Sequence, residues 1–172
     1  MPQPSIKTGD REAPLVSELM PVTIVLDRLR SAFNTGNIFR LADAVRAESV
    51  ITCGYTPSPP HPKLEKTARG CHVTVPSQKA PSAVDAVLDL KGRGYTVYAI
   101  ETATDATPIW DVELSFPAAF VFGNEALGVS ADAVEQADCR IELPCLGYKN
   151  SINVGNCAAV VLYEALRQWR RS

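Results

Sequence analysis

The chain of 172 residues has the length of one domain, and its 46% of hydrophobic residues suffice for a packed core, which excludes disorder of the whole chain. Seventeen Lys and Arg residues stand against nineteen Asp and Glu residues, so the formal net charge of -2 excludes a basic field over the whole molecule. A polyanionic partner would therefore need a local basic patch.

Residues 1–20 carry three prolines and no hydrophobic periodicity, which predicts a flexible lead-in before a single domain over residues 21–172. The first residues are polar and charged, where a secretory signal needs an apolar run. The longest strongly apolar stretch, Cys157 to Tyr163, is far shorter than the roughly 20 residues of a membrane helix. We therefore expect a cytoplasmic protein that does not enter a membrane.

The first half of the domain shows a β-α-β pattern. An apolar run at residues 22–26 has the length and composition of a strand, helical spacing begins at Ser31, and a second strand is predicted at residues 49–53. A proline-rich loop at residues 54–62 precedes a short predicted helix at residues 64–69.

The alternation continues to the end of the chain. Strands are predicted at residues 72–75, 95–100, 118–122 and 140–143. Helices are predicted at residues 83–90, from a Ser130 cap to about Ala137, and over residues 151–169 as a long amphipathic helix. Six strands that alternate with helices predict an α/β fold with a mostly parallel six-stranded sheet and helices on both faces.

The five cysteines are scattered singly without a C-x-x-C pair, which predicts reduced thiols packed as small hydrophobic side chains. Cys71 and His72 with His61 form one cluster of metal-ligand residue types, but adjacent ligands match no common zinc spacing. We predict no metal site.

Ligands of parallel sheets bind at the carboxyl ends of the strands, and three segments at strand-to-helix turns carry polar residues and glycines suited to such a site: residues 34–40, 123–128 and 144–153. The second begins like a phosphate-binding loop, but Val129 stands where that loop needs lysine. No G-x-G-x-x-G follows the first strand, and the G-x-S-x-G of many hydrolases is missing. Ser151 keeps two open roles, as cap of the last helix or as a direct participant in chemistry.

Together the three segments resemble the motifs of the SpoU (TrmH) family of RNA ribose 2'-O-methyltransferases, in the SPOUT superfamily, over roughly residues 22–170. The residues that carry the resemblance are Asn34, Gly36 and Arg40 in the first motif, Phe122, Gly123, Glu125 and Gly128 in the second, and Leu143-Pro144 with Ser151-Ile152-Asn153-Val154 in the third. One departure is Gly155 at the start of the last helix, which should cost about 1 kcal/mol relative to Ala. The chain is also short, like the minimal family members that lack an appended RNA-binding domain.

The resemblance implies a C-terminal deep trefoil knot and S-adenosylmethionine as the methyl donor. The cofactor-binding residues that it implies are Ile100, Glu101, Gly123, Leu143, Ser151 and Ile152. The implied catalytic residues are Asn34, Arg40, Glu125, Ser151 and Asn153.

The implied reaction is attack of a ribose 2'-hydroxyl on the sulfonium methyl group. A guanidinium stays protonated at neutral pH, so we favour Arg40 as a group that positions RNA phosphate and polarises the hydroxyl, with a role as base left open. Asn34 and Asn153 orient the ribose or hold loops, and Glu125 either fixes its loop or pairs with Arg40.

The candidate RNA-binding residues are Arg28, Arg30, Lys63, Lys66, Arg69 and Lys149. The resemblance also implies a homodimer formed with the last helix. tRNA is the favoured substrate, ribosomal RNA is the nearest alternative, and a non-catalytic RNA-binding or assembly factor is the alternative from another class.

Overall fold

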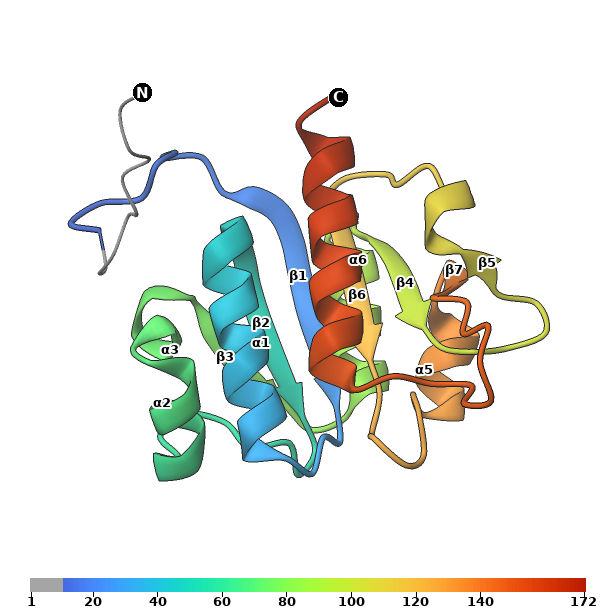
Figure 1. Ribbon diagram of the computed structural model, residues 1–172, viewed down its shortest axis with the longest axis horizontal. Coiled ribbons are helices and arrows are strands. Elements are labelled where there is room, and N and C mark those ends of the chain that lie inside the picture. Colours follow the sequence, from blue (N-terminus) through green and yellow to red (C-terminus); the bar gives the residue numbers. More distant parts are fainter. Residues whose placement is uncertain (1–10) are drawn as a thin grey trace, which may run out of the picture.

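The computed structural model describes residues 11–172, which form a seven-stranded sheet with the order β3-β2-β1-β6-β4-β7-β5. All pairs of neighbouring strands are parallel, which confirms an α/β fold with a parallel sheet (Figure 1). The strands are Met20–Asp27 (β1), Ala47–Cys53 (β2), Ser77–Ala80 (β3), Thr96–Ile100 (β4), Thr107–Pro108 (β5), Ala118–Phe122 (β6) and Cys139–Glu142 (β7).

The predicted sheet is wrong at its two edges. The strand predicted at residues 72–75 is a short helix, Cys71–Thr74 (α3), and the edge strand β3 follows it. β3 is mostly exposed and reads Ser-Gln-Lys-Ala, so it lacks the apolar run that identifies a buried strand. The opposite edge, β5, has only two residues, too few to give a periodic signal, and it raises the number of strands from six to seven.

Helices cover both faces of the sheet. They are Ala32–Val45 (α1), Pro62–Ala68 (α2), Cys71–Thr74 (α3), Ala83–Gly92 (α4), Ala131–Gln136 (α5) and Val154–Trp169 (α6), with a 3-10 turn at Ile109–Asp111. One buried cluster joins Ile24 of β1 to residues of α1, α2 and α6, and the other joins Val25 to residues of α4 and α5. Because neighbouring strand residues face opposite sides, the apolar run of β1 serves both clusters.

The strand register brings the carboxyl ends of the central strands together. Leu26 of β1 pairs with Phe122 of β6, which also pairs with Ile100 of β4, and Ile100 pairs with Ile141 of β7. The segments that follow these four strands therefore start at the same edge of the sheet. α1 and α6 lie side by side over one face, so their amino-terminal turns are close to that edge (Figure 1).

The start of α6 corrects the prediction for Ser151. The helix begins at Val154, and its cap is Asn153, whose Oδ1 accepts hydrogen bonds from the backbone N–H groups of Gly155 (2.9 Å) and Asn156 (3.3 Å). Asn and Ser are comparably good caps, so the choice between them could not be made from residue type.

Residues 1–10 lie outside the described residues, so the expected flexible lead-in over residues 1–20 is described only from residue 11. Residues 11–19 form neither helix nor strand. Within residues 11–172, no helix has both the length and the apolar character needed to cross a membrane. The trefoil knot stays a prediction.

Candidate functional site

A cleft of about 680 Å³ lies at the carboxyl ends of β4, β6 and β7. It is lined by residues 100–102, 122–128, 142–143, 145, 149–154 and 157. Its volume is within the usual range of small-molecule sites, roughly 300–1,000 Å³. The lining includes every residue proposed for cofactor binding, namely Ile100, Glu101, Gly123, Leu143, Ser151 and Ile152.

The two glycines of the second motif shape the wall of the cleft. A Cβ on Gly128, which has a φ of +68°, would lie 2.2 Å from Oε2 of Glu101, and that carboxylate accepts a hydrogen bond from the backbone N–H of Val129 (2.8 Å). A Cβ on Gly123 would lie 2.1 Å from the carbonyl carbon of Gly128. These glycines therefore let the loop fold back on itself and close over Glu101, which no single-residue signal in the sequence indicates.

A hydrogen-bonded cluster joins the three motif segments. Nδ2 of Asn34 donates to Oε1 of Glu125 (3.0 Å), and Nδ2 of Asn153 donates to Oδ1 of Asn34 (3.2 Å). The carboxylate of Glu125 also accepts from the backbone N–H groups of Arg30 (3.0 Å) and Ser31 (3.2 Å). Glu125 was expected either to fix its loop or to pair with Arg40. These hydrogen bonds correspond to the first role.

The electrostatics of this cluster favour an ionised carboxylate. Partial desolvation opposes ionisation of the mostly exposed Glu125, but the hydrogen bonds from the Arg30 backbone, the Asn34 amide and the Ser31 backbone outweigh it and lower the pKa of Glu125. Glu125 is therefore an acceptor that anchors its loop, and an ionised carboxylate of this kind cannot act as a general acid at neutral pH.

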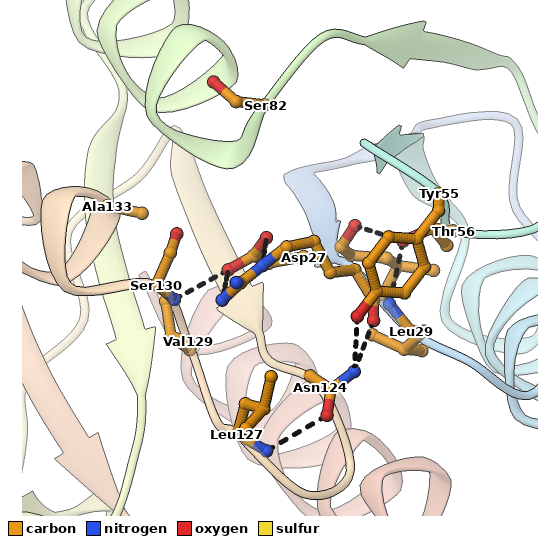
Figure 2. Close-up of polar contacts among 12 residues, drawn as sticks. Asp27, Leu29, Tyr55, Thr56, Ser82, Asn124, Leu127, Val129, Ser130 and Ala133 are labelled. Atoms are coloured by element: carbon orange, nitrogen blue, oxygen red, sulfur yellow. Dashed lines mark hydrogen bonds and ion pairs between the residues drawn. The ribbon is translucent and has the colours of Figure 1, made fainter.

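The buried carboxylate of Asp27 ties the end of β1 to the start of α5 (Figure 2). Its Oδ1 pairs with Nε of Arg28 (3.0 Å), and its Oδ2 accepts a hydrogen bond from the backbone N–H of Ser130 (2.7 Å). Ser130 occupies the predicted N-cap position of α5, but its side chain makes no capping hydrogen bond. The backbone N–H of Ser130 is instead held by Asp27, which lies outside the predicted site.

Asn124 holds the second motif against the loop that follows β1. Its Nδ2 donates to the carbonyl oxygen of Arg28 (2.7 Å) and to Oη of Tyr55 (3.0 Å), and its Oδ1 accepts from the backbone N–H groups of Ala126 (2.8 Å) and Leu127 (3.0 Å). Figure 2 shows the contacts of this buried side chain with Tyr55 and Leu127. The position of an Asn in a tight loop could have indicated this role in the sequence, because Asn side chains commonly form hydrogen bonds with backbone groups in turns.

A second cavity, of about 790 Å³, lies between α1 and α2. We call it the basic basin; it is lined by residues 30–33, 40, 57, 61, 63, 66, 67 and 69. Its lining gathers Arg40 and four of the six candidate RNA-binding residues, Arg30, Lys63, Lys66 and Arg69. All five are exposed, and the lining, which falls wholly within residues 11–172, includes no Asp or Glu.

Gly36 allows the two walls of the basic basin to approach each other. A Cβ at this position would lie 2.6 Å from the carbonyl oxygen of Leu64 and 2.8 Å from Cβ of Thr67. The glycine of the first motif therefore supports close packing of α1 on α2, which brings Lys63 and Lys66 opposite Arg40.

Two of the candidate RNA-binding residues lie outside the basic basin. Arg28 pairs with buried Asp27, and this hydrogen-bonded pair raises the pKa of the guanidinium. Lys149 is exposed at the rim of the cleft, on the wall that also contains Ser151. Contact of either residue with RNA stays a prediction, and the structure separates both from the five clustered cations.

Cys157 lines the cleft without being a nucleophile. Burial raises the pKa of its thiol to about 12, with smaller contributions from Cys145 and Glu101. A thiol with so high a pKa is protonated at neutral pH, and only the thiolate is strongly nucleophilic. Cys157 therefore acts as an apolar part of the wall.

The residues of the cleft suit a nucleoside-like cofactor. Ile100, Leu143 and Ile152 offer apolar surface, while Thr102 and Asn150, joined by a hydrogen bond of 3.2 Å, offer polar groups. Apolar walls with a few placed polar groups are typical of cofactor sites. Within the described residues, no group of three or more His, Cys, Asp or Glu residues could hold a metal ion.

Comparison with known proteins finds relatives that methylate RNA. The family described as SpoU rRNA Methylase matches residues 21–163. The tRNA (guanosine(18)-2'-O)-methyltransferase of Thermus thermophilus is 37% identical over 150 residues, which cover 86% of this chain and 75% of that protein. The 23S rRNA (uridine(2479)-2'-O)-methyltransferase of Streptomyces viridochromogenes is 29% identical over 149 residues, which cover 84% of this chain and 52% of that protein.

Solved structures have the same fold. The TrmH/SpoU tRNA modifying enzyme of A. aeolicus superposes with a TM-score of 0.80 at 28% identity, covering 88% of this chain and 77% of that one. The SpoU methyltransferase AviRb of Streptomyces viridochromogenes, solved with the cofactor AdoMet, gives a TM-score of 0.80 at 26% identity and covers 87% of this chain and 61% of that one.

Proposed function

This chain belongs to the SpoU rRNA Methylase family, and on that premise we propose that it transfers the methyl group of S-adenosylmethionine to a ribose 2'-hydroxyl of RNA. The observation that carries the proposal is the cluster of Asn34, Glu125 and Asn153, which joins all three motif segments by hydrogen bonds. The cluster lies between the cleft and the basic basin, because Glu125 lines the first cavity and bonds to Arg30 and Ser31, which line the second.

The cleft is the site for the cofactor. When bound, S-adenosylmethionine supplies an electrophilic methyl group on a sulfonium centre. Ile100, Leu143 and Ile152 provide apolar contact for its adenosine part, and backbone groups near Gly123 contribute polar contacts.

Arg40 acts on the RNA. Its guanidinium is exposed in the basic basin, where it holds a phosphate and donates a hydrogen bond to the ribose 2'-oxygen. With the cofactor bound, its methyl group would pass to the 2'-oxygen, the electron pair of the carbon–sulfur bond would stay on sulfur, and the hydroxyl proton would pass to a phosphate oxygen or to water. Asn34 and Asn153 hold the motif segments at the spacing that places the ribose in line for this displacement.

We favour tRNA as the substrate, since the relative at 37% identity is a tRNA methyltransferase, and ribosomal RNA is the alternative. These substrates imply a cytoplasmic location.

We also propose a homodimer through the outer face of α6, where Val160 and Tyr163 are exposed. Val161 and Ala165 of that helix are buried in the chain's own core, so they do not contribute to a dimer surface.

Two measurements test this function. Calorimetry should detect binding of S-adenosylhomocysteine, and mapping of ribose methylation in cells that lack the protein should find one or more 2'-O-methyl groups missing from tRNA. Missing groups in ribosomal RNA alone would move the substrate to the ribosome. RNA binding without measurable affinity for S-adenosylhomocysteine would instead identify a non-catalytic RNA-binding factor.

A further inference from the structure

The basic basin contains one large aromatic side chain that the proposed chemistry does not use. Phe33 lies on the first turn of α1 and is 68% exposed, although α1 buries its other aromatic residue, Phe39, completely. An exposed phenylalanine stabilises no core, and its ring is displayed inside a cavity whose other prominent groups are cations.

The ring and the cations share one surface. Phe33 and Arg40 are seven residues apart on α1, which places them two helical turns apart on the same side. Lys63, Lys66 and Arg69 form the opposite wall. Within the described part of the chain, none of these four cations takes part in an ion pair, so their charges are available to a ligand.

The surface is continuous with the proposed site of methyl transfer. The backbone N–H of Arg30, a residue that lines the basic basin, donates to the Glu125 carboxylate, and Glu125 lines the cleft. A strand of RNA whose ribose lies beside the cluster of Asn34, Glu125 and Asn153 would therefore extend into the basic basin, where Phe33 is exposed. Cations alone attract any polyanion, including a duplex, whereas an aromatic face adds affinity only for a base that is out of its helical stack.

We propose that Phe33 stacks on an unpaired base of the RNA substrate, next to the methylated ribose, while Arg40, Lys63 and Lys66 hold the adjoining phosphates. The inference rests on the proposed function, since it places the RNA of that reaction in the basic basin. Stacking on Phe33 makes the basic basin selective for single-stranded or looped RNA. The residue that distinguishes unpaired from paired RNA then lies outside the family motifs.

The test compares Phe33→Leu, Phe33→Trp and the wild-type protein. The probes are a fluorescently labelled single-stranded RNA oligonucleotide and the same oligonucleotide annealed to its complement, with binding followed by fluorescence anisotropy. Loss of one base stack should weaken single-strand binding by Phe33→Leu about 5- to 100-fold. Phe33→Trp should bind within about threefold of wild type because the larger ring retains the stack.

Controls separate this inference from the proposed function and from damage to the fold. Leu88→Ala removes another exposed apolar side chain, from α4 on the other face of the sheet, and should leave RNA binding unchanged. Affinity for S-adenosylhomocysteine should be equal in all variants, because Phe33 does not line the cleft.

Equal single-strand affinity of Phe33→Leu and wild type would overturn the inference and leave the methyltransferase intact. Equal weakening of single-strand and duplex binding would also overturn it, because stacking requires an unpaired base. A change of oligomeric state by light scattering, with RNA affinity unaltered, would assign Phe33 to a protein interface instead. A selective loss of single-strand binding in a protein that transfers no methyl group would support stacking while refuting the proposed function.

Discussion

Single residues divide here into those that hold the site together and those that are proposed to contact RNA. Glu125, Asn34 and Asn153 are engaged with one another, so their first effect is to fix the distance between the motif segments. Arg40 lies in the basic basin beside other cations rather than against Glu125. Substitution of the two kinds of residue should therefore have different consequences.

Arg40→Ala should lower methyl transfer to RNA by about 100-fold or more, because it removes a charged donor from the reacting hydroxyl. Affinity for S-adenosylhomocysteine, measured by calorimetry, should change little. Arg40→Lys should recover only a small part of the rate, since an ammonium cannot reproduce the planar donor pair of a guanidinium. Arg93→Ala, at the end of α4, is the matched control and should retain full activity; retained activity in Arg40→Ala would remove Arg40 from the mechanism.

The lowered pKa of Glu125 predicts a pH-dependent contribution to stability. Because the folded-state pKa is below the unfolded value of about 4.3, the contribution is complete above that pH and is lost as the pH falls through the folded-state value. Glu125→Gln should destabilise the protein by about 1 kcal/mol at pH 7, a modest effect because the residue is exposed. Urea unfolding should show this difference shrinking below about pH 4. A difference that grows on acidification, or an equal effect from Glu135→Gln on α5, would contradict this role.

At the scale of elements, the site depends on how α1, α2 and α6 begin and pack. Asn153 both caps α6 and reaches Asn34 on α1, so the start of one helix fixes the position of the other. Gly155 contributes to the same approach, because a Cβ there would lie 2.7 Å from Nδ2 of Asn37. The predicted cost of a helical glycine is thus offset by closer helix packing.

Capping of α6 can be tested by a pair of alanine variants. Asn153→Ala should lower the free energy of unfolding by about 1 kcal/mol, because two backbone N–H groups lose their acceptor. Ser151→Ala should change it by less than about 0.5 kcal/mol, because the hydroxyl caps nothing. Thermal unfolding measures both, and a larger loss in Ser151→Ala than in Asn153→Ala would refute the assignment of the cap.

Gly36→Ala tests the packing of α1 on α2. The added methyl group meets backbone atoms of α2, so the variant should lose about 1–3 kcal/mol of stability and bind RNA more weakly as the walls of the basic basin separate. Gly92→Ala, at the end of α4, meets nothing within 4 Å and should be neutral or more stable by about 0.4–1 kcal/mol. Denaturant unfolding of the two variants should differ in sign or size; equal values would exclude the close contact.

For the molecule as a whole, the sequence predicted the elements whose apolar residues recur at regular spacing. The apolar run of β1 and the spacing of α6 are periodic, and from them the α/β fold with a parallel sheet followed. Edge strand β3 was not predicted, because an exposed Ser-Gln-Lys-Ala segment lacks the apolar pattern of a strand. The close approach of Gly128 to Glu101 was also not predicted. The two residues are far apart in sequence, and the pairing of β4 with β6 brings them together.

The sequence predicted the type of reaction but not the arrangement of the residues that would bind RNA. The motif segments pointed to RNA ribose methylation and to S-adenosylmethionine, in agreement with the relatives found. Composition gave a net charge of -2, and the six cations selected as candidate RNA-binding residues could not be resolved into one cluster from the sequence. The concentration of cations became visible only once α1 and α2 were packed, because Arg40 and the lysines of α2 lie on separate elements.

Transfer of tritium from methyl-labelled S-adenosylmethionine to tRNA, followed by digestion to nucleosides, shows whether the protein methylates a ribose 2'-hydroxyl. We expect label in 2'-O-methylnucleosides and its loss with Arg40→Ala. Label confined to the bases, or no label from a folded protein that binds S-adenosylhomocysteine when it is offered both tRNA and ribosomal RNA, would contradict it.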